Sequence, residues 1–158
     1  MPKLSAGILL YRQAEDVGVE VLIVHPGGPL WKHRDAHSWS VPKGEHEPGE
    51  DAEQTAVREF AEELGRPPPP GSRLELGEIR QSGGKRVRVW AVEAPDFTTA
   101  DLVSNEFEIE WPPGSGTVQS FPEVDRAEWT SLDLARERLV RGQVDFLDRL
   151  IGLIGHRS

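Results

Sequence analysis

The stretch that decides the fold is GEHEPGEDAEQTAVREFAEELG, which runs from Gly44 to Gly65. Its second half has apolar residues at helical spacing, with Asp51 as a capping residue before them and Gly65 as a stop signal after them. We therefore predict an amphipathic helix that begins just after Asp51 and ends at Gly65. The residues expected on its buried face are Ala52, Ala56, Val57, Phe60, Ala61 and Leu64.

Three glutamates, Glu59, Glu62 and Glu63, lie beside this apolar face. Spacings of three and four place their side chains on one side of a helix. Glu59 and Glu63 form a like-charge pair that costs an isolated helix roughly 0.2 to 0.5 kcal/mol, and a bound cation would reverse that effect. Because Mg²⁺ and Mn²⁺ prefer oxygen ligands, we predict a site for such an ion here, with Arg58 orienting Glu62 from one turn away. A solvated helix face with ordinary ion pairs is the alternative.

The segments on both sides of this helix predict a mixed sheet. Runs rich in Leu, Ile and Val, divided by turn residues, are typical of strands, and helical spacing returns near the end of the chain. A polar loop at 25–38 is long enough to suggest a binding role. We expect one α/β domain over residues 1–158, an α/β/α sandwich with a mixed sheet. The other predicted segments are strands at 4–11, 19–24, 74–79, 87–92 and 107–111 and near Trp129, a loop at 112–122, and helices at 132–139 and 144–154.

Composition limits the classes of function. The chain has 158 residues, of which 37% are hydrophobic and 28% charged, so it can bury a core of its own. It has no cysteine, which excludes disulfides, zinc–thiolate sites and a thiol nucleophile. A net charge of -9 disfavours nucleic acid and anionic membrane surfaces as partners, so a polyanionic substrate would need metal ions or a local basic patch. Without a recognisable leader or membrane-length apolar run, we expect a cytoplasmic protein; a homodimer is compatible with the sequence.

The charged residues around the predicted helix resemble the signature of the Nudix hydrolases. The resemblance covers roughly a seventh of the chain and fixes both residue type and spacing. Two positions depart from the family pattern, because Phe60 and Arg66 stand where a bulky aliphatic residue is usual. Neither is a predicted metal ligand. The matching residues are Gly44, Glu50, Arg58, Glu59, Glu62, Glu63, Leu64 and Gly65.

The resemblance implies a fold and a reaction. The fold is the Nudix α/β/α sandwich, and the reaction is hydrolysis of a nucleoside diphosphate linked to another group, with Mg²⁺ or Mn²⁺ required. Lys43, between Pro42 and Gly44, is similar to the residue found in diadenosine and diphosphoinositol polyphosphate hydrolases, whereas many triphosphate-cleaving members have glycine there. We expect a dinucleoside polyphosphate or a nucleoside triphosphate as substrate. A nucleotide-sensing module without turnover and a protein-interaction module are the alternatives.

The resemblance also implies roles for the charged residues. Glu59, Glu62 and Glu63 are expected to bind metal and activate water, with Glu59 preferred as proton acceptor and Arg58 supporting them. The carbonyl of Gly44 is expected as a further ligand, and Glu50 through water. A last carboxylate is expected ahead of the final strand. Glu123 resembles it, and the competing candidates are Glu106, Glu108 and Glu110.

Substrate contacts are predicted mainly from charge and aromatic character. Lys43 could contact a phosphate, although an exposed lysine without a role is the alternative. Lys32 in the first long loop and Arg88 in a predicted strand could supply a local positive patch. Trp31 could stack on a base. The three histidines of the same loop have no zinc-like spacing and are compatible with solvated loop positions.

Overall fold

The helix predicted from Asp51 to Gly65 is present in the computed structural model as α1 (Ala52–Leu64). The Asp51 side chain accepts a hydrogen bond from the backbone N–H of Gln54 at 3.1 Å, which satisfies one of the free donors at the start of the helix. Gly65 ends the helix in the left-handed conformation, with φ of 83°. Both predicted boundaries are confirmed. The structure describes residues 3–14, 16 and 18–155.

The predicted sheet is also present, and it is mixed. Its strands run in the order β4-β5-β1-β2-β8, with β3 pairing on β1. β1 is parallel to β5 and antiparallel to β2 and β3. The bounds are β1 (Leu4–Ala14), β2 (Gly18–Pro26), β3 (Lys43–His46), β4 (Arg73–Arg80), β5 (Arg86–Glu93) and β8 (Val124–Ser131).

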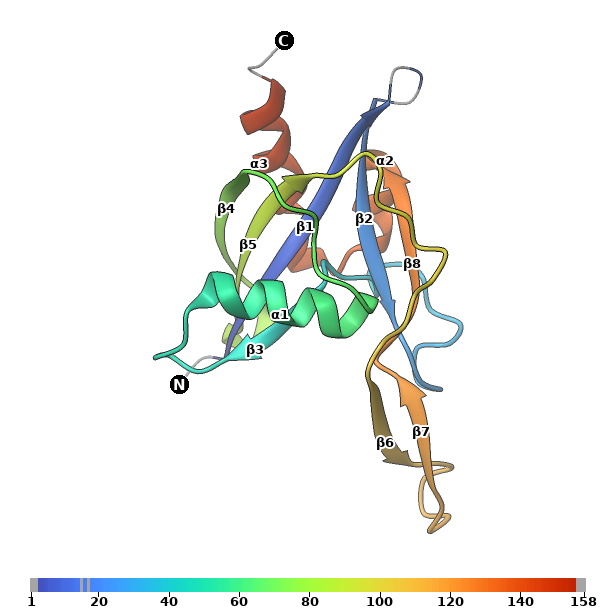
Figure 1. Cartoon of the computed structure of the whole chain (residues 1–158). Coiled ribbons are helices and arrows are strands. Elements are labelled where there is room, and N and C mark those ends of the chain that lie inside the picture. Colours follow the sequence, from blue (N-terminus) through green and yellow to red (C-terminus); the bar gives the residue numbers. More distant parts are fainter. Residues whose placement is uncertain (1–2, 15, 17, 156–158) are drawn as a thin grey trace.

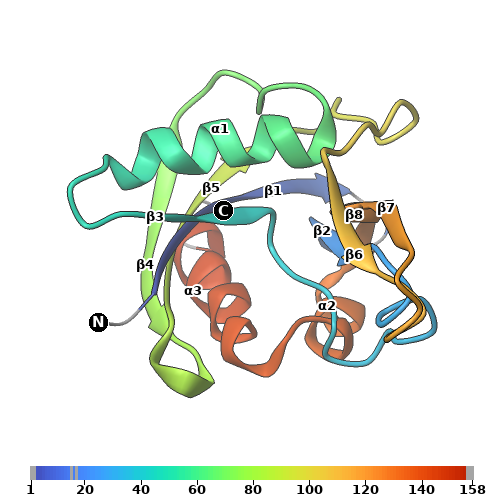
Figure 2. The ribbon, with the colours of Figure 1, turned by 90° about the horizontal axis from the view of Figure 1, so that it is seen from below.

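Helices cover both faces of this sheet, which gives the predicted α/β/α layers (Figures 1 and 2). Successive side chains of a strand point to opposite faces, so Ile8 packs in the core under α1 with Phe60, whereas Leu9 packs in the opposite core with Phe146. The helices on that second face are α2 (Leu132–Arg138) and α3 (Asp145–Ile154), and short 3₁₀ turns lie at Ser82–Gly84 and Arg141–Gln143. No helix in the described ranges is both long and apolar enough to span a bilayer.

β1 and β2 separate toward one end, and the segment that leads into α1 fills the gap. Val24 and Ser40 exchange backbone hydrogen bonds of 2.9 Å in both directions, and the N–H of Ile8 donates to the carbonyl of Pro42 at 3.1 Å. Beyond this point the chain continues as β3, a strand that the sequence analysis missed because its residues have little β propensity. Lys43 and Gly44 are therefore held within the sheet, directly beneath α1.

A two-stranded hairpin projects from the body beside the start of β8 (Figure 1). It consists of β6 (Glu106–Glu110) and β7 (Val118–Pro122), paired antiparallel. The prediction of a loop at 112–122 was thus wrong for its second half. β7 is half-buried at most and has no run of buried apolar residues that would reveal a strand. At the base of the hairpin, the N–H of Glu123 donates to the carbonyl of Asn105 at 2.8 Å.

Candidate active site

The glutamates of α1 lie against β3, and Gly44 makes room for one of them. A Cβ atom at Gly44 would stand 2.0 Å from the carboxyl carbon of Glu59, so any larger residue would displace that carboxylate. The Glu59 side chain is only 16% exposed. The predicted neighbourhood of Gly44 and Glu59 is therefore present, and the absence of a side chain at Gly44 defines the space in which the carboxylate sits.

Glu63 and Lys43 form the most enclosed part of this neighbourhood. The backbone N–H of Lys43 donates to the Glu63 carboxylate. Burial raises the pKa of Glu63 to about 8, opposed by the nearby Lys43 ammonium and reinforced by repulsion from Glu59 and Glu123. Burial likewise lowers the pKa of Lys43, opposed chiefly by Glu63. Both groups thus resist ionisation because the site excludes water.

Two further carboxylates share the same field. The pKa of Glu59 is raised by burial and then by repulsion from Glu62, and the pKa of Glu123 is raised by the same two causes in the same order. The Arg58 guanidinium donates to Glu59 and Glu62 at 3.3 Å each, so the predicted pair with Glu62 is confirmed. Negative charge therefore collects where α1 approaches the start of β8, and a cation would relieve it.

Lys43, Glu63 and Glu123 line a small cleft of about 150 Å³, which we call the glutamate cleft. Glu123 lies in its wall, whereas the competing candidates belong to β6 in the hairpin. There Glu106 accepts from the hydroxyl of Ser120 at 3.0 Å, and Glu110 accepts from the N–H of Gly114 at 2.6 Å. The geometry thus favours Glu123 over them. The residues that line the cleft are Val24, Pro26, Ser38, Ser40, Val41, Lys43, Glu63, Glu123 and Val124.

The oxygen atoms at this site meet some of the requirements of a hard divalent ion such as Mg²⁺. Among residues 3–14, 16 and 18–155, no three carboxylate, imidazole or thiol side chains are close enough to hold a metal ion by themselves. Mg²⁺, however, is commonly held by one or two carboxylates, with water and substrate phosphate completing its coordination. The carboxylates of Glu63 and Glu123 in the cleft, with that of Glu59 held against Gly44, are oxygen donors that suit such an ion. The individual ligands named from the sequence stay predictions.

The predicted substrate residues are not all gathered at the cleft. Arg88 lies on β5, where its guanidinium donates to Glu75 and stands 4.9 Å from the ring of Trp90. Glu50 accepts from the N–H of Glu47 at 2.8 Å in the turn before α1. Neither Arg88 nor Glu50 lines the glutamate cleft. Of the predicted residues, the structure thus brings together Gly44, Glu59, Glu62, Glu63, Glu123, Lys43 and Arg58.

A second hollow of about 420 Å³, which we call the outer cleft, lies between the first long loop and the hairpin. Of the two predicted loop residues, Lys32 lines it, whereas Trp31 is 38% exposed and has the Arg34 guanidinium 5.7 Å from its ring. This site was not predicted from the sequence, because half of the hairpin was expected to be a loop. The residues lining it are Gly28, Pro29, Lys32, Trp111, Gln119, Phe121, Pro122 and Asp125.

His25 was also missed, because it is not the solvated loop residue that the sequence suggested. It is fully buried at the end of β2. Its Nδ1 lies 2.7 Å from Oδ1 of Asp125, and its Nε2 lies 2.7 Å from the carbonyl oxygen of Arg34. The apolar run that immediately precedes His25 was the available signal, since a strand that enters the core can carry the histidine with it. Through Asp125, His25 connects the core to the outer cleft.

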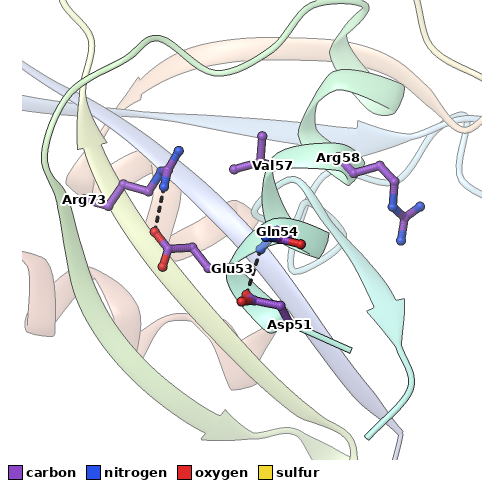
Figure 3. Close-up of a pocket in the computed structure, with 6 residues that line it drawn as sticks. All are labelled: Asp51, Glu53, Gln54, Val57, Arg58 and Arg73. Carbon is purple, nitrogen blue, oxygen red and sulfur yellow. Dashed lines mark hydrogen bonds and ion pairs between the residues drawn. The ribbon is translucent and has the colours of Figure 1, made fainter. Parts of the chain in front are cut away.

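A larger hollow, of about 480 Å³, opens beside the first turns of α1 (Figure 3). Of its charged side chains, Arg73 donates to Glu53 at 2.7 Å and Asp51 accepts from the N–H of Gln54, while Figure 3 shows Arg58 pointing away from them. The carboxyl groups with raised pKa values lie at the other end of the helix. We therefore place the candidate active site at the smaller glutamate cleft, because the chemistry lies there.

Comparisons with known proteins agree on one family. The family model described as NUDIX domain matches residues 1–150. A bis(5'-nucleosyl)-tetraphosphatase (asymmetrical) of Mus musculus is 34% identical over 112 residues, covering 65% of this chain and 72% of the relative. An 8-oxo-(d)GTP phosphatase of Mycolicibacterium smegmatis is 30% identical over 146 residues, covering 85% of this chain and 37% of the relative. The structure of an Ap4A hydrolase binary complex from C. elegans aligns with a TM-score of 0.64 at 22% identity, over 96% of this chain and 98% of the other.

Proposed function

This chain belongs to the NUDIX domain family and is a hydrolase of that family, and from this premise we propose that it cleaves a phosphoanhydride bond in a nucleoside diphosphate linked to another group. We further propose that residues 1–158 act as a single domain, that the glutamate cleft is its active site and that the ion is Mg²⁺ or Mn²⁺.

The observation that carries this proposal is the gathering of carboxylates that cannot all ionise comfortably without a cation. Glu59, Glu63 and Glu123 come from two distant parts of the chain, and the pKa of each is raised by burial together with repulsion from a neighbouring glutamate. A purely structural surface would gain nothing from this arrangement. A polyphosphate bound with divalent ions would turn the same charges into ligands.

We propose that Glu59 accepts the proton of the attacking water. Glu63 already accepts from the backbone of Lys43 and lies near its ammonium, so part of its capacity is engaged. Glu59 faces the space over Gly44, and Arg58 steadies it from the solvent side. A carboxylate whose pKa is raised toward neutrality is a better base at neutral pH than a solvated one.

The remaining residues of the cleft would bind and orient the substrate. Lys43 is held in β3 with its ammonium inside the cleft, where it can neutralise a phosphate oxygen. The ion would be held by members of the set Gly44, Glu59, Glu62, Glu63 and Glu123, and when bound it neutralises phosphate charge and lowers the pKa of coordinated water.

We propose a dinucleoside polyphosphate as the preferred substrate, with a nucleoside triphosphate as the second candidate. Lys43 and the similarity to a bis(5'-nucleosyl)-tetraphosphatase support the first. The second is supported by the similarity to an 8-oxo-(d)GTP phosphatase. Both substrates present a run of phosphates that could lie along the glutamate cleft while a base lies outside it.

The test is a hydrolysis screen with product identification. Diadenosine tetraphosphate, nucleoside triphosphates including 8-oxo-dGTP, and ADP-ribose are incubated with Mg²⁺ or Mn²⁺, and products are identified by mass after reaction in ¹⁸O-water. We expect Glu59→Gln and Glu63→Gln to lower kcat by about 100-fold or more. Glu53→Gln serves as control, because Glu53 is on the same helix but pairs with Arg73.

Two results would contradict the proposal. The first is a wild-type protein that binds these compounds but releases no product with either ion, which would favour a sensing module. The second is a pair of cleft variants that turn over substrate as fast as the Glu53→Gln control.

A further inference from the structure

The hairpin β6–β7 has two chemically different faces. Residues directly opposite one another in an antiparallel pair share a face, and here Phe107 pairs with Phe121 and Ile109 with Gln119. Trp111 continues this apolar face, and its N–H donates to the carbonyl of Thr117 at 2.9 Å. The opposite face carries the carboxylates Glu106, Glu108 and Glu110. The apolar face is half-buried and turned toward the first long loop, where it forms one wall of the outer cleft.

Close contacts between loop and hairpin fix the floor of the outer cleft. The N–H of Gly27 donates to the carbonyl of Glu123 at 3.0 Å, and a Cβ atom at Gly27 would stand 1.9 Å from the carbonyl oxygen of Pro122. A Cβ atom at Gly28 would stand 2.9 Å from Cζ of Phe107. Two adjacent glycines therefore let the loop touch the hairpin directly. The cleft is built by packing, not by a chance gap between two projecting segments.

The outer cleft adjoins the glutamate cleft. Glu123 and Val124 line the glutamate cleft, and the residues on either side of them, Pro122 and Asp125, line the outer cleft. Because an extended chain advances about 3.3 Å per residue, the residues that line the two clefts lie only a few ångströms apart along this segment. A ligand with phosphates at Glu123 would place the group attached to them at the mouth of the outer cleft.

Polar groups at the rim of the outer cleft add hydrogen-bonding capacity. Oδ1 of Asp125 lies 2.7 Å from Nδ1 of the buried His25, which fixes the carboxylate. The contacts of Asp125 with His25 and Arg126 both use Oδ1, so Oδ2 has no partner in the described part of the chain and is available as an acceptor. Lys32 supplies a donor nearby. The amide of Gln119 donates to the carbonyl of Trp111 at 2.9 Å and steadies the aromatic wall.

We propose that the outer cleft is the subsite for a nucleobase of the substrate, which stacks on Trp111 and Phe121 and offers its edge to Asp125 and Lys32. This inference rests on the proposed function, because the base is the one attached to the phosphates in the glutamate cleft. A flat heteroaromatic ring matches an aromatic wall, and a base edge carries both a donor for Asp125 and an acceptor for Lys32. A volume of about 420 Å³ is within the usual range of small-ligand sites.

The chemistry of the rim favours a base over a second copy of the chain. A dimer contact would have to cover Lys32 and Asp125 and leave their charges poorly solvated. A base presents complementary groups to both. Trp111 is also distinct from Trp31, which the sequence suggested for stacking, because Trp31 does not line either cleft.

The experiment measures binding and turnover in matched variants of the whole chain. ADP and GDP are titrated by calorimetry, with inorganic pyrophosphate as the base-free probe, and KM and kcat are measured with diadenosine tetraphosphate. Trp111→Ala should weaken ADP or GDP binding and raise KM by about 5- to 150-fold, the range expected for loss of one base stack, with kcat changed far less. Pyrophosphate binding should be unchanged. Glu108→Gln, on the opposite face of the same strand, should match the wild type.

A conservative variant separates stacking from folding. Trp111→Phe keeps an aromatic face, so it should recover most of the affinity while removing the quenching of tryptophan fluorescence that ADP or GDP causes. Unchanged nucleotide affinity in Trp111→Ala, or an equal loss of affinity for nucleotide and pyrophosphate, would overturn the inference. The inference would also be overturned if Trp111→Ala abolished dimerisation and left nucleotide affinity unchanged. If the wild type binds nucleotides at Trp111 but hydrolyses none, the proposed function fails and this subsite stands.

Discussion

Replacing Glu63 with glutamine should change how the stability of the metal-free protein depends on pH. The pKa of Glu63 is raised from 4.5 to about 8, so the folded protein holds this proton more tightly than the unfolded chain does. Its favourable contribution is complete below pH 4.5 and is lost as the pH rises through about 8. A shift of one pKa unit corresponds to about 1.4 kcal/mol, so the free energy of unfolding lost by pH 8 is at most about 4 kcal/mol. Because the side chain is partly exposed, solvent screening reduces the expected loss to about 1–3 kcal/mol.

Urea unfolding followed by tryptophan fluorescence, with EDTA present, measures this effect at pH 5.5 and pH 8.5. The wild type should lose stability between the two values relative to Glu63→Gln, which cannot ionise. Lys43 contributes a slope of opposite sign, because its lowered pKa makes the folded state hold its proton less tightly, whereas Glu59 and Glu123, with raised pKa values, keep slopes of the same sign as Glu63. The variant should therefore lose clearly less stability than the wild type between the two pH values. Glu53→Gln should follow the wild type. Parallel curves for the wild type and Glu63→Gln would refute the assignment of a buried, proton-holding carboxyl at this position.

Two other substitutions test the packing around the cleft. Gly44→Ala should change the free energy of unfolding by no more than about 1 kcal/mol, because the atom that the new Cβ meets is the movable end of Glu59. The same substitution should lower kcat/KM by about 100-fold, because it displaces that carboxylate. Gly49→Ala, with nothing within 4 Å of its Cβ, is the control, and equal activity of the two variants would contradict this prediction. Gln143→Leu should destabilise the protein by about 1–3 kcal/mol, measured by urea unfolding, because the N–H of Val41 that donates to Gln143 Oε1 at 2.8 Å would lose its buried acceptor; an unchanged midpoint would exclude this.

The elements predicted well from sequence are those whose local signals agree with their burial. α1 has a capping residue, an apolar stripe and a terminal glycine, and each is used in the structure. The helix at the end of the chain likewise buries Phe146 and Leu150 at the expected spacing. β3 and β7 were missed for the opposite reason. Lys43–His46 is a strand only because β1 offers free backbone groups, and Val118–Pro122 only because β6 lies beside it, and neither cause is visible in the local sequence.

The candidate site divides in the same way. The spacing of Glu59, Glu62 and Glu63 on one helix is a local property, so the sequence was enough to group them. Glu123 lies close to these glutamates only because of the way the chain returns from the hairpin to β8. From the sequence alone, Glu123 was one of four candidates. The association of Asp125 with the buried His25 spans 100 residues and had no signal in the pattern.

The hydrogen bond between Asn105 and Glu123 makes the hairpin leave and rejoin the body at one point. A segment whose ends already meet can be exchanged for another with little cost in chain entropy and without altering the strands around it. The groups that we propose for phosphate cleavage belong to α1, β3 and the first residues after this junction, whereas the wall that we propose for the base belongs to the hairpin. Reaction chemistry and choice of substrate can therefore diverge independently in proteins built on this plan.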